Sequence, residues 1–257
     1  MAIHFADTTS GIVFGDIGRI AGLTNLSVAF TVTTRAAGMG YGYILSQWGD
    51  AAPTTQRAFI VYWGTTDEVH FTVYYNGGYL GYRTNSSRFV PGAFLRVLWR
   101  AFDLDSAGRS MDCWINGTKE AGLIDGSVSP TLVTQVNNAS SNVCLGYQVA
   151  SPSYGMYGTY SEIAIWGEKV PDTFARDYGL GLAPAAHPRN GILYAPLGNI
   201  VPVNVWGVAS VGVQTGGRQG PHPLTMEYGR GRHGLTGDAK LDEALKGYLI
   251  PGGGVLT

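Results

Sequence analysis

Hydrophobic and polar residues alternate along most of the first 170 residues of the chain, which is the pattern of half-buried β-strands. In Leu26–Thr34 the apolar residues stand at every second position, with Ser, Ala and Thr between them. β-Branched residues are frequent in these segments, as is typical of strands. The alternation predicts strands over Leu26–Thr34, Tyr41–Trp48, Ala58–Trp63, Val69–Tyr75, Tyr79–Arg83, Phe94–Phe102, Met111–Ile115, Asn142–Tyr147 and Met156–Trp166.

Turn sequences separate these segments. Asn76-Gly77 and Asn116-Gly117 supply residues that tolerate the positive φ angles of a tight hairpin turn. Phe94–Asp103 and Ser110–Gly117 are two alternating segments joined by a short polar loop, which predicts a long hairpin. Short strands at this spacing, with such turns between them, indicate a sandwich or a jelly roll.

The pattern changes after residue 183, where Pro and Gly recur and little of the chain could form a core of its own. Gly191–Leu197 predicts one more short strand, and Asp238–Leu249 predicts a helix with Asp238 as its N-cap. We therefore divide the chain into a jelly-roll domain over residues 1–183 and an extended C-terminal arm over residues 184–257. Such an arm must pack on its own domain, stay disordered or dock on another subunit. We expect it to dock on a partner through the apolar stripe of its helix, with Leu241, Leu245, Tyr248 and Leu249 as contacts.

Composition and charge narrow the classes of protein. Only 14% of the residues are charged, the net charge is −1, and 45% are hydrophobic, which excludes strong disorder and argues against a nucleic-acid binder. Neither a signal peptide nor an apolar run long enough for a membrane helix is visible, so we expect a protein made in the cytoplasm that binds no membrane. Cys113 and Cys144 are expected to be buried free thiols, although the sequence leaves their pairing open.

No catalytic signature is present. Glycosidases use a pair of carboxylates, and alternating acidic residues on one strand would place them on one face. The closest acidic groupings, Asp103/Asp105 and Asp67-Glu68, lie in predicted turns, where Asp usually serves the backbone. The G-x-S-x-G, H-E-x-x-H and P-loop motifs are also missing. We therefore expect no enzymatic activity and no cofactor.

The order of the segments resembles the concanavalin A-like lectin/glucanase superfamily, and within it the laminin G-like jelly rolls. The resemblance implies an all-β fold, a two-sheet antiparallel jelly-roll sandwich, here followed by an irregular C-terminal extension with a short helix. It covers about residues 1–180 and is carried by Leu26–Val32, Ile44–Trp48, Phe59–Val73, Phe94–Asp103, Met111–Gly117, Cys144–Tyr147, Gly158–Trp166 and the short helical segment Pro171–Tyr178.

Arg189–Leu197 resembles the segment that follows the jelly roll in laminin G-like proteins of tailed bacteriophages. That resemblance implies a non-enzymatic virion structural protein, a head decoration or minor capsid protein located on the virion. The C-terminal arm would anchor it to the capsid, to other virion proteins or to sister subunits of a homo-oligomer, for which a trimer is one option.

The alternative is a lectin-like receptor-binding or adhesion protein that binds a cell-surface glycan. Sugars stack on exposed aromatic faces, and the hairpin over residues 73–82 is rich in tyrosine. Adjacent strand residues point to opposite faces, so the same tyrosines could instead pack across the strands or contact protein. The candidate contact residues are Tyr74, Tyr75, Tyr79 and Tyr82.

Many laminin G-like domains bind one Ca²⁺ at the sandwich rim, so the resemblance also leaves calcium open. Calcium takes six to eight oxygen ligands. Asp50, Asp67 and Asp103 fall in predicted rim loops and are the candidate ligands. Because aspartate is common in such loops without a metal, we assign no metal ligand.

Overall fold

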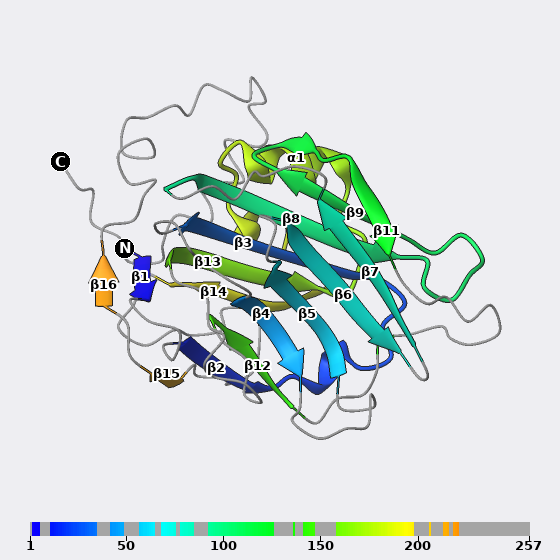
Figure 1. The fold of residues 1–257 in the computed structure, drawn as a ribbon, viewed down its shortest axis with the longest axis horizontal. Helices are drawn as coiled ribbons and strands as arrows, with labels where there is room; N and C mark the ends of the chain where they lie inside the picture. Colours follow the sequence, from blue (N-terminus) through cyan, green and yellow to red (C-terminus); the bar gives the residue numbers. More distant parts are fainter. Residues whose placement is uncertain are drawn as a thin grey trace.

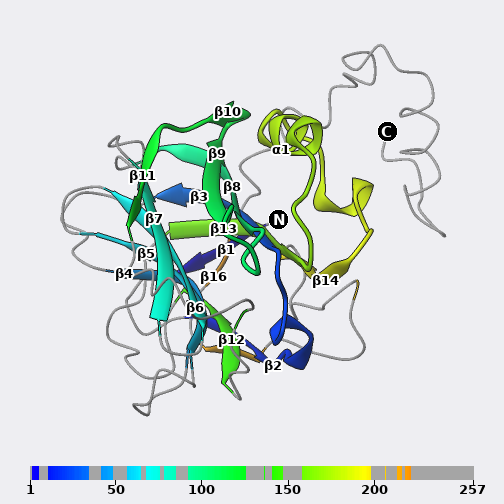
Figure 2. The same cartoon turned by 90° about the vertical axis from the view of Figure 1, so that its right-hand side faces the viewer.

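Two antiparallel sheets packed face to face form the fold of this protein (Figures 1 and 2). The computed structural model describes residues 2–5, 11–34, 42–48, 57–64, 68–75, 78–84, 92–125, 136, 141–146, 158–197, 206, 213–215 and 218–220. The pairings among the described strands are all antiparallel. The expected all-β, two-sheet jelly-roll architecture is therefore confirmed.

The first sheet, called sheet A, has β13 near its middle. This strand pairs with β3 on one side and with both β1 and β14 on the other, so the sheet joins segments far apart in the sequence. Its strands, in spatial order, are β10 (Thr118–Lys119), β9 (Ser110–Ile115), β8 (Phe94–Phe102), β3 (Leu26–Thr34), β13 (Gly158–Trp166), β1 (Ala2–Phe5) and β16 (Arg218–Gly220), with β14 (Gly191–Pro196) beside β13.

The second sheet, called sheet B, contains a run of four consecutive strands, β4 to β7, each paired with the next. It is extended at one edge by β11 and at the other by β12, followed by β2 and β15, which come from opposite ends of the described chain. Its order is β11 (Gly122–Asp125), β7 (Gly78–Thr84), β6 (Val69–Tyr75), β5 (Arg57–Trp63), β4 (Gly42–Trp48), β12 (Asn142–Leu145), β2 (Gly11–Asp16) and β15 (Val213–Thr215).

Strands with unbroken alternation have the bounds that the sequence predicts, as in Leu26–Thr34, Val69–Tyr75 and Phe94–Phe102. The N-terminal strand β2 was not predicted. Its alternation is interrupted at Gly15, which has a φ of 83° and lies where the pairing with β12 shifts register. Such a β-bulge places an extra residue in one strand and breaks the period of two from which strands are recognised.

The core between the sheets is aromatic. The Trp99 ring of β8 lies 5.7 Å from Phe71 and 5.3 Å from Tyr82, both of sheet B, so these contacts join the two layers. Cys113 and Cys144 are buried free thiols, as the sequence predicts. Burial raises the pKa of the Cys113 thiol well above its ordinary value, which keeps it protonated and unreactive.

The β9–β10 hairpin is closed by the predicted Asn116-Gly117 turn, whose residues have φ angles of 49° and 80°. The Asn116 side chain accepts a hydrogen bond from the Arg96 backbone N–H at 2.8 Å. A Cβ added to Gly179, at the end of the neighbouring helix, would lie 1.8 Å from the Gly117 nitrogen. The helix and the turn therefore meet backbone to backbone, and this approach requires glycine on both sides.

That helix, α1 (Asp172–Gly179), covers the outer face of sheet A (Figure 2). It buries an apolar stripe against the sheet, and together they form a second, smaller core. The cores differ in position, since the second lies on the outside of sheet A. Its members are Ala29, Leu98, Ala164, Trp166, Val170, Phe174, Ala175, Tyr178 and Tyr194.

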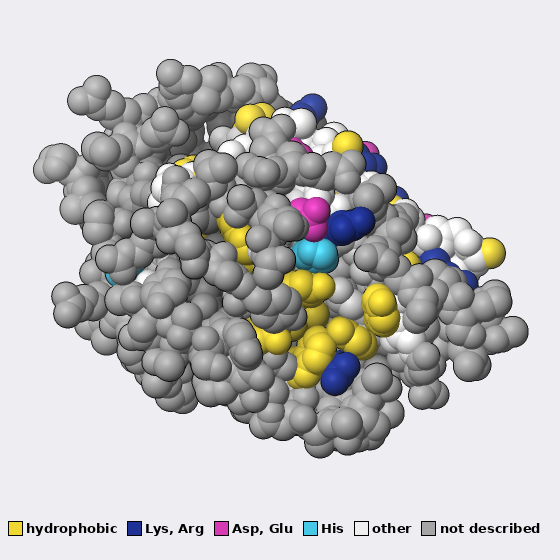
Figure 3. Space-filling model, viewed as in Figure 1, with side chains coloured by type: hydrophobic (Ala, Val, Ile, Leu, Met, Phe, Trp, Pro, Cys, Tyr) yellow, Lys and Arg dark blue, Asp and Glu magenta, His cyan; other side chains and the backbone are white. Residues whose placement is uncertain are grey.

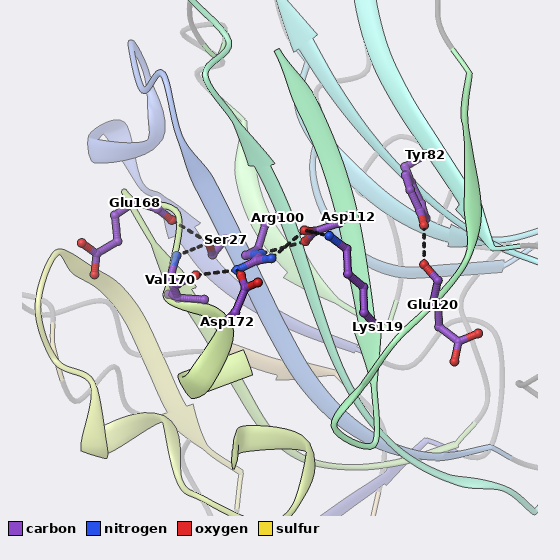
Figure 4. Close-up of polar contacts among 9 residues, drawn as sticks. All are labelled: Ser27, Tyr82, Arg100, Asp112, Lys119, Glu120, Glu168, Val170 and Asp172. Atoms are coloured by element: carbon purple, nitrogen blue, oxygen red, sulfur yellow. Dashed lines mark hydrogen bonds and ion pairs between the residues drawn. The ribbon is translucent and has the colours of Figure 1, made fainter. Parts of the chain in front are cut away.

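A network of charged groups holds the start of α1 on the sheet (Figure 4). Arg100, which is 1% exposed, donates to Asp112 at 2.5 and 2.7 Å, to the Val170 carbonyl at 2.7 Å and to Asp172 at 2.6 Å. Burial alone would lower the pKa of Arg100, but its contacts with the two carboxylates outweigh this effect and raise it. Arg100 therefore stays charged although it is buried, and the hydrogen bond from Arg100 lowers the pKa of Asp172.

The described part of the predicted arm adds strands to the sandwich. The short strand predicted over Gly191–Leu197 is present as β14 (Gly191–Pro196), which pairs with β13. The strands β15 and β16 extend the two sheets at β2 and β1. Trp206 packs on Trp166 and Tyr194 at centroid distances of 5.4 and 5.2 Å. The boundary at residue 183 and the docking role of the arm stay predictions. The candidate arm contacts Leu241, Leu245, Tyr248 and Leu249 lie outside the described residues.

Candidate functional site

The outer face of sheet B carries a cluster of aromatic and charged side chains, which we call the aromatic face. Alternation assigns the inward positions of β5 and β6 to the core, which leaves Tyr62, His70 and Tyr74 pointing outward. The pairing with β7 adds Arg83 opposite His70 and Tyr79 opposite Tyr74. The aromatic face comprises Trp48, Arg57, Tyr62, Glu68, His70, Tyr74, Tyr79 and Arg83.

A β-bulge brings Trp48 and Arg57 together. The pairing of β4 with β5 shifts register between Gln47 and Trp48, so that Trp48 pairs with Arg57. Ala58, the residue skipped by this shift, belongs to the core. The bulge thus turns an arginine onto the outer face beside a tryptophan, as bulges next to functional sites commonly do.

One end of the aromatic face, the Trp48 end, consists of Trp48, Arg57, Tyr74 and Tyr79. The Arg57 guanidinium carbon lies 4.2 Å from the Trp48 ring centroid and 5.7 Å from that of Tyr74, which is cation–π geometry. Tyr74 meets Trp48 edge to face at 5.0 Å and Tyr79 at 6.0 Å. Tyr79 is 39% exposed, and burial raises the pKa of Tyr74. Tyr74 is therefore neutral and can donate a hydrogen bond across the physiological pH range.

The other end, the His70 end, consists of Tyr62, Glu68, His70 and Arg83. The Tyr62 and His70 rings stack with an interplanar angle of 9° and a centroid distance of 4.6 Å. Glu68 Oε2 lies 3.4 Å from His70 Nε2 and 3.7 Å from Arg83 Nη1. This end therefore combines a carboxylate acceptor, guanidinium donors and an imidazole on one small area of surface.

The space-filling view shows how these groups are distributed. Hydrophobic side chains form a band on this face, with acidic, basic and histidine side chains at its upper end and a basic side chain at its lower end (Figure 3). Such a surface pairs flat apolar rings with polar groups that can fix the orientation of a ligand. The arrangement suits a ligand that is apolar on one side and rich in hydroxyl groups around its rim.

The four tyrosines proposed from the sequence have different positions. Tyr74 and Tyr79 form a cross-strand pair on the aromatic face. Tyr82 points to the core, is 5% exposed, packs edge to face on Trp99 and donates its hydroxyl to the Glu120 carbonyl at 2.8 Å (Figure 4). Tyr75 ends β6, and its side chain lies outside the described part of the chain.

Sequence reasoning missed most of the aromatic face. The members that were not identified come from β4, β5, β6, β7 and the residue before β6, so their proximity depends on strand register. One local signal could have found part of the face. Tyr62 and His70 stand at outward positions of two neighbouring predicted strands. The missed residues are Trp48, Arg57, Tyr62, Glu68, His70 and Arg83.

The other clusters of charged side chains are weaker candidates for a ligand-binding or metal site than the aromatic face. In the network at Arg100, the buried groups Arg100 and Asp112 are paired with each other and with Asp172 and Lys119, so their charges are neutralised within the fold. Among the described residues, no group of three or more His, Cys, Asp or Glu side chains is placed to hold a metal ion. Of the candidate calcium ligands, Asp50 and Asp67 lie outside those residues. Nor does the described part contain a helix with the length and apolarity needed to cross a bilayer.

No family model and no curated protein matches this sequence. Solved structures do match the fold. A putative carbohydrate-binding protein from Bacteroides ovatus has a TM-score of 0.57 at 15% identity, over 84% of this chain and 58% of that chain. The present chain therefore spans somewhat more than half the length of that protein.

A second matching structure is the CBM40 of the Ruminococcus gnavus IT-sialidase bound to α2,3-sialyllactose, with a TM-score of 0.52 at 13% identity. The match covers 68% of this chain and 94% of that one. The same CBM40 without that ligand in its name matches with a TM-score of 0.52, over 68% of this chain and 95% of that one, also at 13% identity. At these identities the similarity shows the fold, a jelly roll of the type found in carbohydrate-binding domains.

Proposed function

We propose that this protein is a non-catalytic, lectin-like carbohydrate-binding domain whose glycan lies on the aromatic face of sheet B. The observation that carries the proposal is the Trp48 end, where a half-buried arginine, a tryptophan and two tyrosines gather on the outer face of a sheet. Sugar rings present C–H groups on their faces and hydroxyls at their rims. Aromatic rings with adjacent donors and acceptors match both.

The alternative interpretation of these aromatics is cross-strand packing that only stabilises the sheet. The aromatic side chains of the second core on sheet A have a purely structural role, since Trp166 of β13 and Tyr178 of α1 are both fully buried where the helix packs on the sheet. Tyr79, in contrast, is among the few large hydrophobic side chains of the described residues that remain exposed. The carbohydrate-binding neighbours support the lectin-like interpretation further.

The composition of the face supports binding without catalysis. Glycosidases of the usual two-carboxylate type place these groups roughly 5 to 9.5 Å apart on either side of the scissile bond. Among the eight residues of the aromatic face, Glu68 alone carries a carboxylate, and His70 and Arg83 surround it. A single carboxylate between two basic neighbours is better suited to accept hydrogen bonds from sugar hydroxyls than to act as a catalytic acid.

The virion role expected from the sequence stays a prediction. The structural neighbours support the lectin-like alternative instead, and capsid partners, virion location and a trimeric state have no support from them. An adhesion or receptor-binding role would be one use of a glycan-binding face.

A glycan array tests the proposal, with sialyllactose among the printed sugars because one structural neighbour is named with it bound. The wild type is compared with Tyr79→Ala and with Leu180→Ala. Leu180 is 73% exposed at the end of α1, and its replacement serves as the matched control. We expect wild type and Leu180→Ala to bind the same glycans equally well and Tyr79→Ala to bind them more weakly. If the wild type binds no glycan, or Tyr79→Ala binds as well as the control, the proposal is wrong.

A further inference from the structure

The two ends of the aromatic face are separated along one strand. His70 and Tyr74 both point outward from β6 and stand four residues apart. At about 3.4 Å per residue in an antiparallel strand, their Cα atoms are about 14 Å apart. This span exceeds one pyranose ring, so a single sugar cannot stack on Tyr74 and reach His70 at the same time.

The middle of the face is built from smaller side chains. Thr72 lies between His70 and Tyr74 on the outer side of β6, with Ile60 of β5 on one flank and Gly81 of β7 on the other. Ile60 is fully buried and Thr72 is nearly so, so neither offers a ligand contact surface of its own between the two ends. In Figure 3 the hydrophobic band is continuous between the charged groups at its two ends.

The two ends also differ in chemistry. The Trp48 end offers the exposed Tyr79 ring beside Tyr74, which favours stacking, and Arg57 packs on Trp48 next to this pair. The His70 end offers Glu68 as an acceptor and Arg83 as a donor beside the stacked Tyr62–His70 pair, which favours hydrogen bonds to hydroxyls. A ligand that uses both ends has a stacking residue at one terminus and a hydrogen-bonded residue at the other.

From this separation and asymmetry we infer that the aromatic face has two subsites and binds an oligosaccharide laid along β6 in one direction. The inference rests on the proposed carbohydrate binding and deepens it. The ligand class is then a linear chain of at least two or three sugar units rather than a monosaccharide. Affinity should rise with chain length until both ends are occupied and then level off.

Calorimetric titration with size-graded chains tests this inference. The probes are cello-, laminari-, xylo- and chito-oligosaccharides and oligo-N-acetyllactosamines, each from one to six units. We expect at least a tenfold gain in affinity between the monosaccharide and the trisaccharide or tetrasaccharide of the preferred series, followed by a plateau. Equal affinity for the monosaccharide and the longer chains would overturn the inference.

Two variants assign the subsites. Tyr79→Ala should weaken binding of short and long chains alike, whereas Tyr62→Ala should weaken only chains long enough to reach the His70 end. Truncation of an aromatic contact of this kind should lower affinity roughly five- to tenfold. Circular dichroism and thermal unfolding establish that both variants fold, and Leu180→Ala again serves as the control.

The two proposals fail in distinguishable ways. If branched glycans bind on the array, but none of the linear series binds more tightly as it lengthens, carbohydrate binding stands and the two-subsite inference is wrong. Loss of both short- and long-chain affinity in Tyr62→Ala, with the variant folded, would likewise contradict separate subsites. If no sugar of any kind binds, both proposals are wrong.

Discussion

The two outer faces of this sandwich carry similar side chains in different environments. On sheet A, the Arg96 guanidinium lies 4.5 Å from the Tyr178 ring centroid, fully buried and paired with Glu162 at 2.8 Å. On sheet B, Arg57 lies 4.2 Å from Trp48 and remains half-buried. The comparison shows that an arginine packed on an aromatic ring has no fixed role. Coverage by α1 makes the first a buried structural contact, whereas the second keeps part of its surface exposed to solvent.

The environment also sets the chemistry of the acids on sheet A. Glu162 is buried, and the desolvation of its carboxylate raises its pKa, although Arg96 and a hydrogen bond from Thr31 oppose this effect. Such groups stabilise the fold, because their charges pair with each other inside the protein. A variant on the sheet A side should therefore change stability, whereas a variant on the sheet B side should change affinity.

Loss of the Arg100 side chain should have the largest effect. Arg100→Ala leaves Asp112 buried without its main partner, and removal of one member of a buried ion pair costs about 3–5 kcal/mol. Urea unfolding measures the difference. Arg176→Ala is the control, because its pair with Asp177 is exposed and should contribute less than about 1 kcal/mol. A cost for Arg100→Ala as small as that of the control would mean that the network does not hold the helix.

Gly179→Ala should have the next largest effect. The added Cβ would overlap the backbone of Gly117, so α1 must shift away from the turn, at a cost of about 1–3 kcal/mol for such overpacking. Thermal unfolding compares it with Gly18→Ala, whose added Cβ meets nothing within 4 Å. Glycan affinity should be unchanged in both. If Gly179→Ala is as stable as Gly18→Ala, the close approach of helix and turn is wrong.

Arg57→Met should show most clearly that the two faces differ in role, because it should lower glycan affinity with little change in stability. It removes the charge but keeps an apolar side chain, so stability should change by no more than about 1 kcal/mol, the size of an exposed cation–π contact. Glycan affinity should fall about tenfold. Arg19→Met, at an exposed arginine in the turn after β2, is the matched control. A large loss of stability with unchanged affinity would place Arg57 with the structural arginines of sheet A.

Asp172→Asn should have the smallest effect, and that effect should depend on pH. The hydrogen bond from Arg100 lowers the pKa of Asp172 below its ordinary value, so the ionised carboxylate stabilises the folded state at neutral pH. Because 67% of this side chain is exposed, we expect at most about 1 kcal/mol. The stabilisation should be complete above about pH 5 and disappear as the pH falls below about 4. Denaturant titrations of wild type and variant over pH 3–7 measure it, and a difference that grows at low pH would contradict the assignment.

The fold was largely predictable because its long strands alternate without interruption. Phe94–Phe102 keeps the period of two from end to end, and the turn at Asn116-Gly117 has the conformation that its sequence predicts. β2 was missed because its bulge at Gly15 breaks that period. Short edge strands such as β10, with two residues, carry too little pattern to be recognised.

The site was less predictable, because it depends on register between strands rather than on any single segment. Tyr74 and Tyr79 could be proposed from one hairpin, but the same hairpin suggested Tyr82, whose side chain points to the core. Trp48 and Arg57 meet only through a bulge between β4 and β5. Alternation tells which residues share a face of one strand, whereas the neighbours across strands require the three-dimensional pairing.

The central claim is that the outer face of sheet B binds carbohydrate. Calorimetric titration of wild type, Trp48→Ala and Leu180→Ala with the strongest array glycan tests it most directly. We predict saturable binding by wild type and Leu180→Ala, and at least a tenfold loss of affinity in a folded Trp48→Ala protein. Equal affinity of Trp48→Ala and wild type would contradict it.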